Sequence, residues 1–78
     1  MRDVIELIVK QLVGDADAVD VREVERGDGK TALIEVRVAG GDMGKVIGRQ
    51  GRTVNALRSL LHAAGLKQRR RYVLDIVE

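Results

Sequence analysis

The sequence is best understood from the seven residues Val46-Ile47-Gly48-Arg49-Gln50-Gly51-Arg52. The two glycines of this stretch have no Cβ, so the backbone can turn tightly there and approach a ligand closely. Residues 53–64 follow with helical spacing, which puts Gly51 near a helix N-terminus, where unpaired N–H groups and the helix dipole favour phosphate. Lys45 and the two arginines of the stretch place three cations around the turn. These features predict a loop that holds a polyanion backbone.

The first half of the chain predicts a helix followed by a β-hairpin. Apolar residues recur at helical spacing over residues 4–12. Asp3 is expected to cap this helix at its N-terminus, and Gly14 is expected to end it. Two β-branched runs, residues 19–24 and 31–38, flank a Gly-Asp-Gly turn. Such runs around a glycine-containing turn indicate two antiparallel strands.

The second half predicts two helices joined by the glycine loop, and then a strand. Asp42 is expected to cap a short helix that ends at Ile47. The apolar residues of 53–64 form one stripe, and Gly65 is expected to cap the C-terminus of that helix. Residues 69–77 are predicted to form a strand, with Tyr72, Leu74 and Ile76 on one face and Val73 and Val77 on the other. The predicted order is therefore helix, strand, strand, helix, helix, strand.

This order and the Ile-Gly-x-x-Gly loop resemble the type II KH domain. The loop stands as Ile47-Gly48-Arg49-Gln50-Gly51, followed by Val54 and Leu57 where the second helix of KH domains presents apolar residues to the core. The length and N-terminal pattern look most like the KhpA family, small bacterial stand-alone KH proteins that bind RNA together with a partner. The resemblance covers residues 1–78 as one α+β domain, with three helices on one face of a three-stranded mixed sheet. The crossover between the second and third strands implies that this pair is parallel.

The resemblance also implies a site for single-stranded RNA, with no cofactor, no metal and no small-molecule substrate. KH loops clamp the nucleic-acid backbone, and a narrow aliphatic groove holds the bases. The backbone N–H groups of residues 49–51 are expected to hold phosphates. The residues expected to contact RNA are Lys45, Val46, Ile47, Gly48, Arg49, Gln50, Gly51, Arg52, Val54 and Arg71.

Two functions are consistent with this resemblance. The first is an RNA-binding protein that acts as an RNA chaperone or post-transcriptional regulator. The alternative is a protein-interaction module, forming a homodimer or a heterodimer with a second RNA-binding protein, in which RNA contact is secondary. One small KH groove makes few contacts, so association with a second RNA-binding unit would raise avidity in either case.

Charge is distributed unevenly, although the net charge of the whole chain is only +2. Residues 1–42 carry six Lys/Arg and ten Asp/Glu, a net of −4, whereas residues 43–78 carry eight and two, a net of +6. Only the half with the loop is basic, as expected of a nucleic-acid face, and uneven scatter of surface charge is the alternative. The Lys-Gln-Arg-Arg-Arg run at residues 67–71 either contacts phosphate or forms a solvated turn after the helix.

Composition excludes several other classes. The absence of cysteine excludes disulfides and thiolate metal sites. Tyr72 is the only aromatic residue, too few for the stacking platforms of RRM and OB folds, and is expected to lie in the core with a solvated hydroxyl. Gly44 and Lys45 do not form a P-loop, because Val46 stands where that motif needs Ser or Thr.

No catalytic constellation can be assembled from the remaining polar residues. His62 is the sole histidine, on a helical stretch, and stays unassigned. No triad, dyad or metal cluster is indicated, so no enzyme activity is expected. Neither a signal segment nor an apolar run of about 20 residues is present, so a cytoplasmic location is expected.

Overall fold

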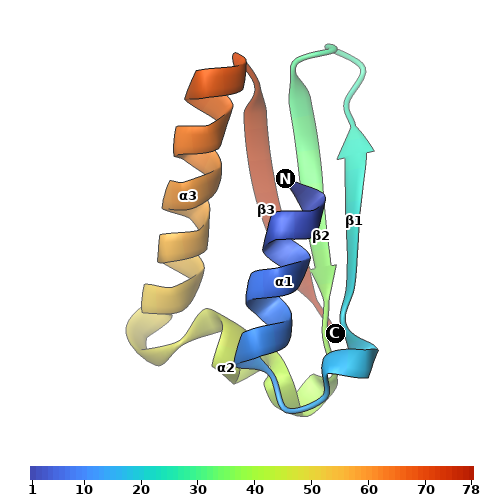
Figure 1. Cartoon of the computed structure of the whole chain (residues 1–78), viewed down its shortest axis with the longest axis vertical. Coiled ribbons are helices and arrows are strands. Elements are labelled where there is room, and N and C mark those ends of the chain that lie inside the picture. The colour runs from blue at the N-terminus through green and yellow to red at the C-terminus, as the bar shows by residue number, and fades with distance from the viewer.

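The computed structural model describes all 78 residues, and its elements follow the predicted order (Figure 1). The helices are α1 (Arg2–Leu12), α2 (Met43–Ile47) and α3 (Arg52–Gln68). The strands are β1 (Asp20–Glu25), β2 (Thr31–Arg37) and β3 (Arg71–Val77). Short 3-10 turns lie at Ala16–Ala18, Gly40–Asp42 and Arg49–Gly51. The α+β class and the order α-β-β-α-α-β are confirmed.

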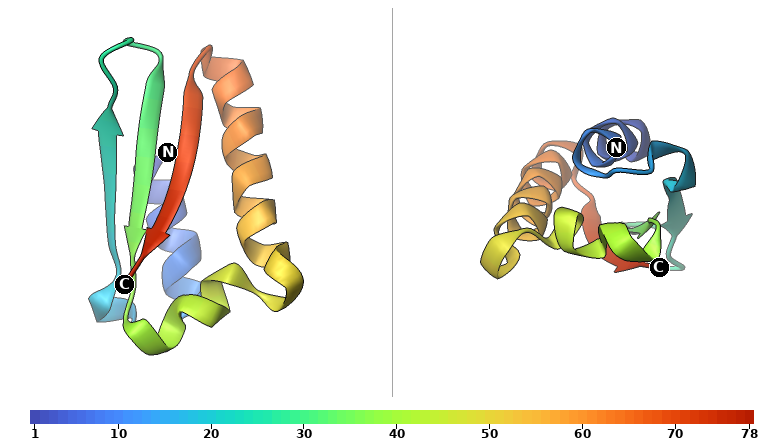
Figure 2. Two further views of the ribbon diagram at one scale, coloured as in Figure 1. Left: turned by 180° about the vertical axis from the view of Figure 1, so that it is seen from behind. Right: turned by 90° about the horizontal axis from the view of Figure 1, so that it is seen from below.

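The sheet has the strand order β1-β2-β3. β1 pairs with β2 in antiparallel fashion, with Val21 opposite Val36, and β2 pairs with β3 in parallel fashion, with Ile34 opposite Leu74. The predicted parallel pair is therefore confirmed, and the connection through α2 and α3 forms its crossover. Figure 2 shows the sheet from behind, with the helices on the far side and no helix in front of the other face.

The core lies between the sheet and the helices because apolar residues recur with the period of each element. Every second residue from Ala32 to Val38 is buried, which places one whole face of β2 against the helices. The helices contribute residues spaced three or four apart, namely Ile5, Val9, Val54, Leu57 and Leu61. Tyr72 packs against this core, and its hydroxyl donates a hydrogen bond to Gln68 Oε1 at 2.7 Å.

The N-terminus of α1 differs from the expectation. The helix begins at Arg2 with Met1 as its N-cap, so Asp3 lies within the first turn and does not cap it. The Asp3 carboxylate instead pairs with Arg2, with 2.8 Å between Nη1 and Oδ1. At the other end, the helix stops at Leu12 and Val13 is the cap, one residue before Gly14.

The C-terminus of α3 also differs, because the helix continues past Gly65 to Gln68. Arg69, with φ 56°, is the left-handed residue that caps it. Gly65 is buried inside the helix, and its carbonyl accepts the Arg70 N–H at 2.8 Å. A Cβ at Gly65 would meet the Arg70 backbone, with 3.3 Å to the carbonyl carbon and less to its oxygen. This glycine therefore allows the close approach of the following turn, rather than ending the helix.

Asp42 joins two distant segments instead of capping α2 with its side chain. It occupies the N-cap position but makes no cap hydrogen bond. Its buried carboxylate accepts the N–H of Asp15 at 3.1 Å and of Gly14 at 3.2 Å, and lies 3.3 Å from Lys45 Nζ. These partners, the Asp15 and Gly14 amides first, lower the pKa of Asp42. The Asp42 carboxylate thus connects the residues that follow α1 to the start of α2, the helix that leads into the glycine loop.

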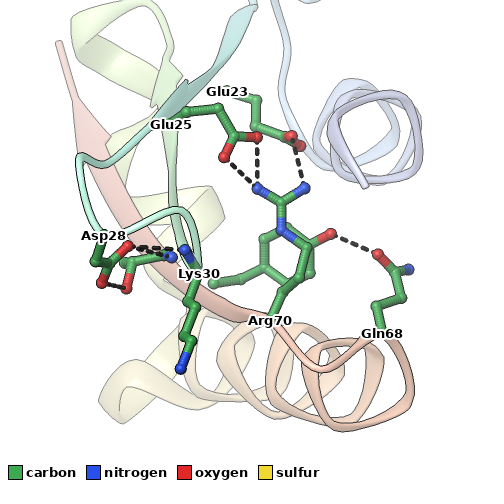
Figure 3. A network of polar contacts seen from close by, with 8 residues as sticks. Glu23, Glu25, Asp28, Lys30, Gln68 and Arg70 are labelled. Atoms are coloured by element: carbon green, nitrogen blue, oxygen red, sulfur yellow. Dashed lines mark hydrogen bonds and ion pairs between the residues drawn. The ribbon is translucent and has the colours of Figure 1, made fainter.

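The fold is expected to lose stability in acid. In the hairpin turn, Asp28 accepts the N–H groups of Lys30 and Thr31 and the Thr31 hydroxyl, which together lower its pKa from 3.8 to about 2 (Figure 3). A carboxylate with a lowered folded-state pKa stabilises the fold above its unfolded pKa and loses that contribution as the pH falls through the folded value. The melting temperature should therefore fall between pH 3.8 and about 2.

The double variant Asp28→Asn and Asp42→Asn tests this origin of the acid sensitivity. Neither asparagine titrates, so its melting temperature, measured by circular dichroism, should depend less on pH across the same window. An equally steep fall in the variant would contradict the assignment to these two carboxylates.

None of the helices has the length and hydrophobicity needed to span a bilayer. No group of three or more His, Cys, Asp or Glu side chains is placed to hold a metal ion.

Candidate nucleic-acid interface

The glycine loop, residues 48–51, is a tight turn between α2 and α3 at the lower end of the molecule in Figure 1. Gly48 has φ 77° and Gly51 has φ 75°, in the region that favours glycine. A Cβ on Gly48 would also come within 2.9 Å of the Thr53 nitrogen and would collide with the Thr53 side chain. Backbone conformation therefore favours glycine at both positions, and space requires it at the first.

Arg49 and Gln50 lie exposed at the tip between the glycines. Gln50 is also left-handed, with φ 57°, and its Oε1 accepts a hydrogen bond from Arg52 at 3.3 Å. The Gly51 N–H donates to the Gly48 carbonyl at 3.1 Å, so it is used within the turn. This differs from the expectation that all three N–H groups of the loop hold phosphate, and leaves those of Arg49 and Gln50 as the candidates.

The three cations expected around the loop are all exposed. Arg49 and Arg52 lie on the turn itself and at the first position of α3. Lys45, on α2, pairs with Asp42, yet its side chain keeps 55% of its exposure. The Lys45 ammonium group therefore remains open to solvent although it is paired with Asp42.

The apolar residues beside the loop do not all line a groove. Val46 is completely buried and Val54 is only 8% exposed, because both pack into the core under α2 and α3. The expectation that their side chains contact bases is therefore not supported by their burial. Ile47 is 38% exposed and keeps an apolar surface next to the first glycine.

A groove of about 740 Å³ lies between α3 and β3. Its apolar edges are Leu66, 70% exposed, and Val73, 36% exposed, and Arg71 lies on the β3 side as expected. The α3 wall was not predicted from the sequence; it consists of Arg58, Leu61, His62 and Leu66. Residues four apart lie on one helix face, so the spacing 58, 62 and 66 was the available signal.

Arg70, unlike the other cations of residues 67–71, is paired with two carboxylates of β1 (Figure 3). Its guanidinium is hydrogen-bonded to the Glu25 carboxylate, lies 4.0 Å from Glu23 and sits 5.6 Å from the centre of the Tyr72 ring. These neighbours, Glu25 first, raise its pKa. Arg70 therefore ties the turn to β1, and the exposed cations of the run are three: Lys67, Arg69 and Arg71.

Comparison with known proteins matches this architecture to one family. The family model described as "KhpA/KhpB, KH domain" matches residues 2–76. The chain is 49% identical over 78 residues to RNA-binding protein KhpA of Aquifex aeolicus, covering 100% of this chain and 96% of that protein. It is 50% identical over 78 residues to RNA-binding protein KhpA of Halalkalibacterium halodurans, covering all of both chains. RNA-binding protein KhpA of Caldanaerobacter subterraneus is 43% identical over 77 residues, covering 99% of this chain and 100% of that protein. No solved structure gives a significant match.

Proposed function

Because the chain belongs to the KhpA/KhpB family of KH domains, we propose that it binds single-stranded RNA through the glycine loop. The relatives with the most similar sequences are named RNA-binding proteins. The observation that supports the proposal most directly is the loop geometry. Two left-handed glycines hold an exposed tip immediately before the N-terminus of α3, a helix of 17 residues. Such a helix end attracts phosphate.

In the proposed complex, the loop holds the backbone and the groove holds the bases. Phosphates approach the N–H groups of Arg49 and Gln50, and Lys45 and Arg52 add positive charge. Val46 and Val54 act from the core by fixing α2 and α3 on either side of the turn, so that the loop is ordered before RNA arrives. A site that is ordered in advance loses less conformational entropy on binding. The proposed role is that of an RNA chaperone or post-transcriptional regulator.

Association with a second RNA-binding unit is the second proposed property, as a homodimer or a heterodimer. Leu7 on α1 is 63% exposed and Leu60 on α3 is 40% exposed, and neither lines the groove. Avidity favours association, because one small groove makes few contacts and a second RNA-binding unit would strengthen binding. Crosslinking in cells, followed by sequencing of the bound RNA, separates the two functions. A well-expressed protein that enriches no RNA would favour the interaction module.

Binding is expected to weaken steeply with salt. If three to five phosphates are contacted, the slope of log affinity against log salt concentration should be roughly −2 to −3.5 for a single strand. Fluorescence anisotropy of a short uridine- or adenine-rich RNA, titrated at several salt concentrations, measures it. A slope near zero would rule out the phosphate clamp.

Single strands are expected to bind better than a duplex of the same sequence. The loop needs an accessible backbone, and the groove needs unpaired bases that can leave the stack. Competition of unlabelled single-stranded and double-stranded RNA against one labelled strand gives the ratio directly. Equal or tighter binding of the duplex would point to nonspecific electrostatic attraction by the cations of residues 67–71 instead.

A further inference from the structure

We propose that one RNA strand runs along the whole of α3, from the glycine loop to the basic turn at residues 67–71. The footprint would then exceed the roughly four nucleotides that a KH loop clamps. This inference rests on the proposed function, because the loop supplies one end of the path. α3 has 17 residues and therefore extends the path by about 25 Å beyond the loop.

A continuous stripe of exposed side chains connects the two ends. It consists of residues spaced three or four apart along one face of the helix: Asn55, Arg58, His62, Leu66 and Arg69. At the loop end, the Asn55 amide nitrogen lies 3.8 Å from where a Cβ on Gly51 would be. At the other end, Arg69 is the exposed cap residue of the helix. The stripe thus begins beside the second glycine and ends in the basic turn.

The middle of this stripe forms one wall of the α3–β3 groove. Leu66 and Val73 give the groove two apolar edges against which a base can pack. His62 lies between Arg58 and Leu66 on the helix wall, and it is the one exposed ring that faces the groove. Rings and arginine planes are surfaces on which unpaired bases stack. The groove therefore suits bases, while the cations beside it suit the backbone.

The charge of this part of the chain specifies the occupant. Residues 43–74 contain no Asp or Glu and carry eight Lys/Arg. Arg70, which also lines the groove, is paired with Glu25 of β1 and therefore adds no free positive charge (Figure 3). The far end keeps three exposed cations, and no carboxylate of this segment opposes a phosphate along the helix. A polyanion with flat apolar groups, a single strand of RNA, complements this surface.

The test is a series of oligouridylates from about four to about ten nucleotides, titrated by fluorescence anisotropy. The wild-type affinity should keep rising beyond about four nucleotides. The variant Lys67→Ala and Arg69→Asn should lose this further rise and still bind the shortest RNA. Asparagine is chosen at Arg69 because it tolerates the left-handed conformation. The control variant Arg26→Ala and Lys30→Ala removes two exposed cations from the hairpin and should keep the rise.

The outcomes separate this inference from the proposed function. A wild-type affinity that stops rising at about four nucleotides would overturn the extended path and leave the loop as the site. No binding at any length would overturn the proposed function itself. If the affinity of the basic-turn variant rose with RNA length as steeply as that of the wild type, the extended path would also be overturned. Complete displacement of the longer RNAs by polyglutamate would overturn it as well. A second measurement needs only the wild type: the salt slope should steepen with length, by about 0.7 for each added phosphate contact.

Discussion

Replacing Arg49 and Gln50 together by aspartate is expected to abolish RNA binding and to leave the fold intact. Both side chains are exposed at the loop tip, and aspartate tolerates the left-handed backbone found at Gln50. Surface changes of this kind usually alter the free energy of unfolding by no more than about 0.5 kcal/mol. The local charge falls by three units where a phosphate must approach. The new carboxylates also occupy the positive end of α3.

Melting temperature by circular dichroism and RNA affinity by anisotropy should be measured on one preparation. Arg26→Asp, at the exposed hairpin, is the control for a change of charge at a distance from the loop. It should retain most of the affinity. Full affinity of the loop variant with a normal melt would show that the glycine loop is not the binding element. A much lower melting temperature of the loop variant would assign its loss of RNA affinity to unfolding instead.

Gly65→Ala is expected to destabilise the protein by about 2 kcal/mol, within the range of overpacked cores. The new Cβ would strike the Arg70 backbone, which cannot swing aside as a side chain could. The turn that carries Arg70 to Glu25 would have to shift, and Tyr72 with it. Gly44→Ala is the matched control, because Gly44 also lies in a helix but has nothing within 4 Å of its Cβ position.

The control should behave in the opposite sense. Alanine is a better helix former than glycine by about 1 kcal/mol, so Gly44→Ala should stabilise the fold modestly. Urea unfolding followed by circular dichroism gives both free energies on the same scale. Equal effects of the two substitutions would show that the close approach at Gly65 is unimportant for stability.

The order of elements could be predicted because each has its own local period. Ile34, Val36 and Val38 alternate as a strand does, and Val54, Leu57 and Leu61 recur as a helix face does. These periods are properties of neighbouring residues, so the sequence displays them directly. The glycine loop was equally visible, because its backbone conformation excludes most other residues at Gly48.

Several of the errors concern residues whose role depends on partners in another element or turn. Glycine is a residue type typical of helix ends, which is why Gly65 was predicted to cap α3. Its close contact with Arg70 exists only once the turn after α3 has folded back. Aspartate is a residue type typical of N-caps, yet the carboxylate of Asp42 accepts hydrogen bonds from backbone amides 27 and 28 positions earlier. Arg70 is one of three identical neighbours, and only the pairing with Glu25 distinguishes it. Local pattern carries no information about such contacts.

Because β2 pairs with β3 in parallel fashion, the sheet can be completed only late in synthesis, when β3 has emerged. β1 and β2 are joined by a short turn and can pair as soon as both have emerged, since hairpins form within microseconds. β3 follows only after residues 38–70, so until then the central strand has one unpaired edge, which is a site for aggregation. α3 lacks the strand against which it packs for the same interval. The glycine loop therefore leaves the ribosome before β3, and the helix that follows the loop gains its packing partner only when β3 has emerged as well.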